Sequence, residues 1–134
     1  MDRVRHPTPA TGVPAIDAQV GELFVRAHAV LAALRAGEGD ETVLRLLTSL
    51  EQQAIVHFAS EERLMAARGY PAAGAHLREH QKFRQALREA KDLLFRRGPG
   101  PEVTAWLEAL TGEWLVRHVD GDDAPLAAFL VSAR

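Results

Sequence analysis

The hydrophobic positions along this chain recur at alternating steps of three and four, which is the spacing of helices that bury one apolar stripe. The clearest stripe lies between residues 40 and 68 and passes through Val43, Leu47, Leu50, Ala54, His57, Glu61 and Leu64. Similar stripes run through residues 17–36, 72–97 and 102–119. Each stripe predicts the core-facing side of one helix.

The breaks between the stripes are short and rich in residues that end helices. Gly and Pro occupy them at residues 37–39, 69–71 and 98–101. Helices joined by short connections pack antiparallel to their neighbours. The sequence therefore predicts an all-α fold, an up-down-up-down antiparallel four-helix bundle. Residues 1–14 form an N-terminal arm, and a short apolar C-terminal tail at residues 125–131 packs back onto the bundle.

Composition narrows the class of protein. The 134 residues fit a single domain, and 47% apolar with 25% charged residues is ordinary for a globular protein. The net charge of −2, with Lys and Arg spread along the chain, argues against nucleic-acid or membrane partners. No apolar run approaches the roughly 20 residues of a membrane span. Cysteine is absent, and the polar first residues lack an apolar leader segment, so we expect a cytoplasmic protein.

Five polar side chains interrupt the apolar stripes. They are His57, Glu61, His76, His80 and His118. A buried ionised carboxylate costs several kcal/mol unless it is paired or coordinated. Residues four apart on a helix are separated by about 40° and about 6 Å, so both can reach one ion. Imidazole and carboxylate without thiolate suit iron, manganese or zinc.

The antiparallel register places these residues in one layer of the bundle. His57 and Glu61 lie near the end of the second helix, His76 and His80 near the start of the third, and His118 near the end of the fourth. One histidine on an apolar face is usually a hydrogen-bonded core residue. Four in one layer, with a carboxylate among them, favour a shared metal site.

A second carboxylate is available after His118, at Asp120, Asp122 or Asp123. On an ideal helix Asp123 points about 140° away from His118, so it needs a local break, which Gly121 permits. Spacing alone does not choose among the three. The remaining histidines, His6 and His28, are expected to be exposed. The aromatic residues expected in the core are Phe58, Phe83, Trp106 and Trp114.

The ordered motifs His57-x-x-x-Glu61, His76-x-x-x-His80 and His118-x-x-x-x-Asp123 resemble those of the hemerythrins, specifically the bacterial type. The resemblance extends from Gly12 to Leu130. It implies a four-helix bundle with an oxo- or hydroxo-bridged di-iron centre that binds O2 reversibly.

The resemblance also implies a role for each residue. His76, His80 and His118 would ligate one iron, Glu61 and Asp123 would bridge both, and His57 would ligate the second iron, which binds O2. The family motif thus selects Asp123 among the three acidic residues. The residues implied for the O2 pocket are Val20, Trp114, Leu115 and Val119.

One position departs from the family pattern. The family's first helix carries the motif Asp-x-Gln-His, and its histidine ligates the second iron, whereas this chain has Val20 there. His28 is a poor substitute because it lies about 12 Å further along the helix and about 80° around it. The second iron should therefore be weakened. Three outcomes are open: water or another exogenous ligand replaces the histidine, the second iron is lost so that one ion remains, or the site is vestigial.

Binding of O2 or a similar diatomic molecule, for storage, delivery or sensing, is the function that the resemblance favours. No separate acid or base group points to catalysis, so a binding protein is expected rather than an enzyme. An iron with an additional open position is what an enzyme that reduces peroxide, O2 or NO would need. A mononuclear metal-binding protein is the other alternative.

Overall fold

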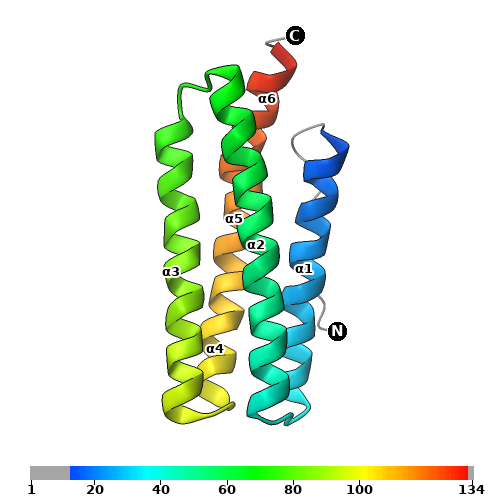
Figure 1. Cartoon of the computed structure of the whole chain (residues 1–134), viewed down its shortest axis with the longest axis vertical. Helices are drawn as coiled ribbons and strands as arrows, with labels where there is room; N and C mark the ends of the chain where they lie inside the picture. Colours follow the sequence, from blue (N-terminus) through cyan, green and yellow to red (C-terminus); the bar gives the residue numbers. More distant parts are fainter. Residues whose placement is uncertain (1–12, 133–134) are drawn as a thin grey trace.

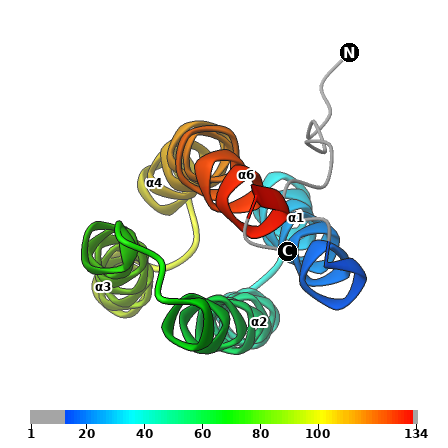
Figure 2. The same cartoon turned by 90° about the horizontal axis from the view of Figure 1, so that it is seen from above.

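The computed structural model describes residues 13–132, which are helical over most of their length and contain no strand. We call each helical column of the bundle a rod. The first three rods are the single helices α1 (Pro14–Arg35), α2 (Asp40–Arg68) and α3 (Ala73–Arg97). Neighbouring rods run antiparallel (Figure 1), and the view along the bundle shows them arranged around one axis (Figure 2). The predicted all-α four-helix bundle is confirmed.

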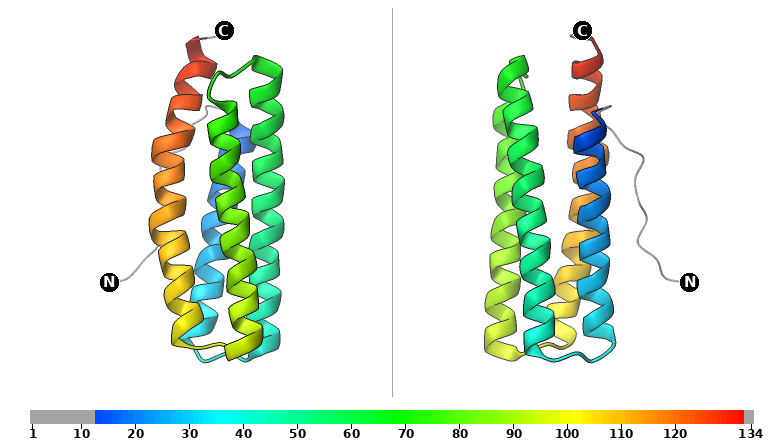
Figure 3. Two further views of the ribbon diagram at one scale, coloured as in Figure 1. Left: turned by 90° about the vertical axis from the view of Figure 1, so that its left-hand side faces the viewer. Right: turned by 45° about the vertical axis from the view of Figure 1, so that its right-hand side comes forward.

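The fourth rod is built from several segments laid end to end. They are α4 (Pro101–Ala109), the π-helical η1 (Leu110–Trp114), α5 (Leu115–Arg117), the π-helical η2 (His118–Asp123) and α6 (Ala124–Ser132). The left-hand view in Figure 3 shows one continuous rod from α4 to α6. The helix predicted to end at residue 119 therefore continues, because the π-turns absorb extra residues without breaking it.

The C-terminal tail packs onto the bundle, but it does so as a continuation of the fourth rod, so the prediction that it folds back was wrong. Residues 125–131 belong to α6 and prolong the fourth rod (Figure 1). Pro125 does not prevent this, because proline is tolerated in the first turn of a helix. Leu126 and Leu130 on α6 are buried in a small cluster with Met65 from the end of α2.

Helix boundaries follow local chemistry. Gly69, with φ of 65°, ends α2 in the left-handed conformation that glycine adopts without strain. The helix α1 begins at Pro14, three residues before the start of the predicted stripe at residue 17. Proline suits this position because the first helical N–H has no intrahelical partner.

The apolar stripes meet in one large core. On α1 the predicted stripe is buried throughout, including Val20 at 5% exposure. Phe58 and Phe83 are fully buried, whereas Trp106 is 39% exposed and so is not the core residue that was predicted. Its indole Nε1 donates a hydrogen bond to the carbonyl of Ala86 at 2.9 Å, which holds the ring across the surface between α4 and α3.

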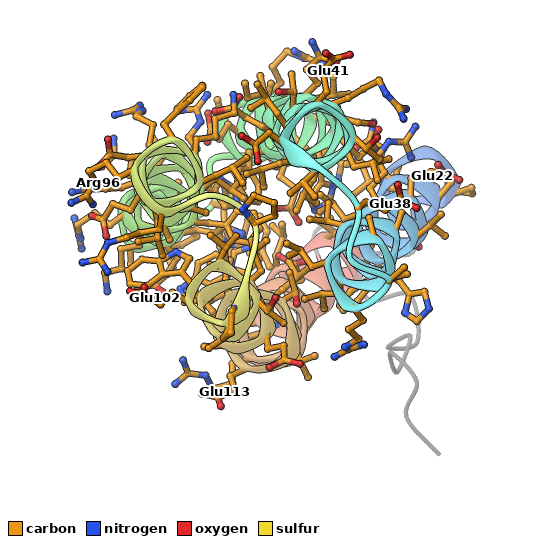
Figure 4. The ribbon with its side chains drawn as sticks, turned by 90° about the horizontal axis from the view of Figure 1, so that it is seen from below. Glu22, Glu38, Glu41, Arg96, Glu102 and Glu113 are labelled. Carbon is orange, nitrogen blue, oxygen red and sulfur yellow. The ribbon has the colours of Figure 1, made fainter. Side chains whose placement is uncertain are left out.

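Charged residues cover the outside of the bundle. In Figure 4 the labelled side chains of Glu41, Arg96 and Glu113 lie at the rim and point away from the core. His28 is exposed as predicted, and His6 lies outside the described residues. Among the described helices, none is both long and apolar enough to cross a membrane.

Candidate metal centre

The six predicted site residues come together in one buried cluster near the end of the bundle where α2 turns into α3. None of their side chains is more than 4% exposed. They are His57 and Glu61 from α2, His76 and His80 from α3, and His118 and Asp123 from η2. The predicted convergence in one layer is therefore what the structure shows.

The carboxylate of Glu61 lies at the centre of the cluster. Its Oε1 is 3.0 Å from His80 Nε2, 3.2 Å from His76 Nε2 and 3.6 Å from His57 Nε2. His118 Nε2 is slightly further away, at 3.8 Å. Each of the four imidazoles thus turns its Nε2 atom toward one carboxylate.

The carboxylate of Asp123 completes the cluster from the fourth rod. Its Oδ1 lies 3.2 Å from His76 Nε2 and 3.3 Å from His118 Nε2. The predicted break at Gly121 does not occur. The segment from His118 to Asp123 is π-helical, so its hydrogen bonds join residues five apart and bring the two side chains to one face.

Three further residues form hydrogen bonds with the outward-facing Nδ1 atoms of three of the histidines. His80 Nδ1 lies 2.8 Å from Glu62 Oε2, His118 Nδ1 lies 2.8 Å from Asp122 Oδ2, and His57 Nδ1 lies 3.2 Å from Gln19 Oε1. Such partners orient a ligating imidazole and raise its basicity. The apolar stripes did not identify these residues, because periodicity marks only inward positions.

Aromatic rings hold two of the imidazoles in place. Phe58 stacks on His80 with ring centroids 3.9 Å apart and an interplanar angle of 11°. Trp114 stacks on His118 at 4.9 Å and 9°. These rings restrict rotation of the two histidines and keep water from their faces.

Burial and mutual contacts shift the acidity of the cluster. Burial lowers the pKa of His57 to about 4, although Glu61 opposes this shift. Burial also disfavours charge on His76, but Asp123 and Glu61 outweigh it and raise the pKa of His76 to about 9. Burial raises the pKa of Asp123 to about 7. Burial opposes ionisation of Glu61 as well, yet the surrounding imidazoles hold its pKa well below the ordinary value.

Several polar atoms of the cluster are buried without a hydrogen-bond partner. They are His57 Nε2, His118 Nε2, Glu61 Oε2 and both carboxylate oxygens of Asp123. Buried polar atoms are nearly always satisfied, so each such atom needs an explanation. Bound cations supply one, because they would accept the lone pairs of these atoms.

The donor atoms fall into two groups that share Glu61. One group is Glu61, His76, His80 and His118, and the other is His57, Glu61 and Asp123. Within each group the donor atoms lie within 4.8 Å of one another. Neutral imidazole and carboxylate are donors that suit iron. The residues present therefore fit a non-haem metal centre.

The residues predicted for the O2 pocket have different surroundings. Val20 and Leu115 are buried in the main core, while Trp114 is half-buried over His118. The side chain of Val119 lies outside the described part of the structure. A polar cavity of about 420 Å³ opens outside His118 and is lined by Glu79, Lys82, Trp114, Arg117, His118 and Asp122.

Fold and site together define a helical-bundle protein with a buried histidine–carboxylate metal centre. The family model for the hemerythrin HHE cation binding domain matches residues 11–130, so the chain belongs to the hemerythrin family. With this cluster in its core, it is a non-haem iron-binding protein.

Curated relatives agree with this assignment. A bacteriohemerythrin from Stenotrophomonas maltophilia is 29% identical over 120 residues, which cover 87% of this chain and 73% of the relative. One from Pseudomonas paraeruginosa is 30% identical over 114 residues, covering 85% of this chain and 72% of the relative. No solved structure gave a significant match.

Proposed function

We propose that this protein binds O2, or a similar diatomic molecule, at a di-iron centre whose second iron site is altered. The role would be storage, delivery or sensing. The observation that carries the proposal is the pair of donor groups that share Glu61, since one carboxylate common to two groups suits a bridge between two ions. The family membership of the chain supports iron as the metal.

The family motif assigns the ligands. His76, His80 and His118 would hold the first iron, and His57 the second, with Glu61 and Asp123 bridging them alongside an oxo or hydroxo group. When bound, the iron pair supplies the electrons for reversible O2 binding. The chain orients the ligands through the outer contacts of the imidazoles, and the stacked rings of Phe58 and Trp114 exclude water.

Val20 makes the second site the weaker one. The α1 side of the cluster has a buried aliphatic side chain at 5% exposure where the family motif has a ligand. The second iron would then have one imidazole, from His57, and a coordination position open to water or to the diatomic molecule. Loss of a ligand should cost at least the 10–100-fold in affinity that loss of an outer-shell partner costs.

The test is iron stoichiometry and optical absorption before and after exposure to O2. We expect two irons per chain after anaerobic reconstitution and a visible charge-transfer band in air. The Val20→His variant should retain the second iron more tightly and form a longer-lived oxygenated state. A wild-type protein that holds fewer than two irons per chain under these conditions would contradict the di-iron proposal.

An enzyme that reduces peroxide, O2 or NO is the second candidate, and the open position left by Val20 favours it. Turnover of peroxide that disappears in Glu61→Ala would support catalysis. Reversible O2 binding without consumption would argue against it. A stoichiometry of one ion would instead indicate the mononuclear alternative. The single-domain organisation, the cytoplasmic location and the absence of nucleic-acid and membrane partners stay predictions.

A further inference from the structure

We infer that Gln19 on α1 is a positioning residue that keeps the proton of His57 on Nδ1 and leaves Nε2 free to bind a metal. The consequence for metal binding rests on the proposed function, whereas the placement of the proton rests on geometry alone. Helix α1 would then serve the site through Gln19, although the next residue, Val20, provides no ligand.

The geometry is a chain of hydrogen bonds between α1 and α2. The hydroxyl of Ser60 donates to the carbonyl of Val56 at 3.0 Å. Because its hydrogen is thus engaged, the Ser60 oxygen accepts a hydrogen bond from Gln19 Nε2, at 3.1 Å. The amide of Gln19 therefore turns its other end, Oε1, toward His57 Nδ1, at 3.2 Å.

An amide oxygen only accepts hydrogen bonds, so Nδ1 of His57 must be the donor. In the neutral ring the second nitrogen, Nε2, then carries a lone pair. This atom faces Glu61 Oε1 at 3.6 Å and has no hydrogen-bond partner. Two lone pairs that face each other in a buried site disfavour the metal-free state. A cation between His57 Nε2 and Glu61 Oε1 would remove this repulsion.

The other two outer contacts do not need such a relay. Glu62 and Asp122 are carboxylates, which can only accept a hydrogen bond when ionised, so each places the proton of its histidine without help. A glutamine amide can either donate or accept. Ser60 removes this ambiguity, because a rotated Gln19 would point its carbonyl oxygen at a hydroxyl whose hydrogen is already engaged.

The experiment is nitrogen NMR of the imidazoles in the metal-free protein at neutral pH. The His57 signals are identified by their loss in His57→Gln. We expect wild type to show a protonated Nδ1 and a bare Nε2. Gln19→Met, which keeps the size of the side chain without an acceptor, should move the proton toward Nε2. Ser60→Ala should give a mixture, because the amide of Gln19 can then rotate.

Two further variants make the test specific. Gln19→Glu supplies an obligate acceptor and should restore the protonated Nδ1, even in combination with Ser60→Ala. Gln53→Met is the matched control: it removes a hydrogen bond from Gln53 Nε2 to the backbone carbonyl of Gln19, at 3.4 Å, without touching the imidazole. It should leave the His57 signals unchanged.

A protonated Nε2 in the wild type, or an unchanged proton position in both Gln19→Met and Ser60→Ala, would overturn the inference. Titration with Fe(II) under anaerobic conditions tests the consequence. Gln19→Met should bind the second equivalent 10–100-fold more weakly, and Gln19→Glu should recover most of that affinity. If wild type binds no second iron, the di-iron proposal fails while the proton position of His57 still stands or falls by NMR.

Discussion

His118 Nε2 and Asp123 Oδ1 lie 3.3 Å apart, although on a regular α-helix two residues separated by five positions would point in different directions. The π-helical winding of η2 removes this conflict. The same turn leaves Asp122 on the outside of His118, where it binds Nδ1 at 2.8 Å. One imidazole is thus held between two neighbouring carboxylates of its own helix.

Replacing Asp123 by asparagine should separate stability from metal binding. Burial disfavours the charged form of this carboxyl, but its contact with protonated His76 offsets that cost, so the metal-free variant should differ little in stability from wild type at pH 8. Its iron affinity should fall at least tenfold, because an amide is a poor bridging ligand. Chemical unfolding and iron titration measure the two effects. Equal iron affinity in the variant and wild type would contradict the assignment of Asp123.

Replacing Gly121 by alanine distinguishes a π-turn from a flexible break. Gly121 is exposed, and a Cβ added there would meet no atom within 4 Å. Its φ does not lie in the left-handed region. Alanine should therefore stabilise the helix by about 0.5–1 kcal/mol and leave metal binding unchanged. A large loss of stability or of bound metal would mean that the segment depends on glycine.

The metal-free protein should lose stability as the pH rises from 7 to 9. The pKa of His76 in the fold is about 9, above its ordinary 6.5, so its contribution is complete below pH 6.5 and disappears as the pH passes 9. A shift of this size corresponds to about 3 kcal/mol. Below pH 7, His57 and Asp123 act in opposite directions, since stability from His57 is lost on acidification and stability from Asp123 is lost on alkalinisation.

The metal-loaded protein should instead gain stability as the pH rises from 7 to 9. His76 must lose its proton to bind a metal, so binding releases protons and strengthens as the pH rises. Calorimetric melting of both forms between pH 7 and 9 measures the difference. His76→Gln should flatten the curve of the metal-free protein. A melting temperature of the wild-type metal-free protein that rises across this range would contradict the prediction.

Replacing Glu62 by glutamine tests the outer contact of His80. The side chain of Glu62 is 30% exposed, so stability should change by no more than about 1 kcal/mol. Iron affinity should fall 10–100-fold, because a neutral amide supports the imidazole less than a carboxylate does. Glu79→Gln, which breaks only the ion pair with Lys82, is the control and should bind iron normally. Similar affinities in the two variants would rule out this role for Glu62.

Helices and inward-facing ligands were readable from the sequence because both depend on spacing along one chain. Repeats of three and four residues predicted the stripes of α1, α2 and α3, and the interruptions at His57, Glu61, His76 and His80 predicted a polar site within the core. Short connections then required the antiparallel order that brings His118 to the same end. These features are local, or follow from local features through chain connectivity.

The course of the fourth rod was decided by tertiary packing. A regular α-helical periodicity predicted an end near residue 119 and a tail that folds back, whereas η1 and η2 widen the helix and α6 continues it. Leu126 and Leu130 find their partner Met65 by continuing along the rod. The spacing of apolar residues did not predict the two π-turns. Such turns form where contacts with other helices outweigh the cost of a less favourable helical geometry.

The sequence by itself determined the fold class, the layer of the site and five of its six central residues, since each follows from the position of a side chain on its own helix. The inward direction of Asp123 depended on winding within η2, which periodicity does not encode. The outer partners Gln19, Glu62 and Asp122 were decided only by the tertiary structure. Their contacts require particular distances across the bundle or across a widened turn, and those distances exist only after the helices have packed.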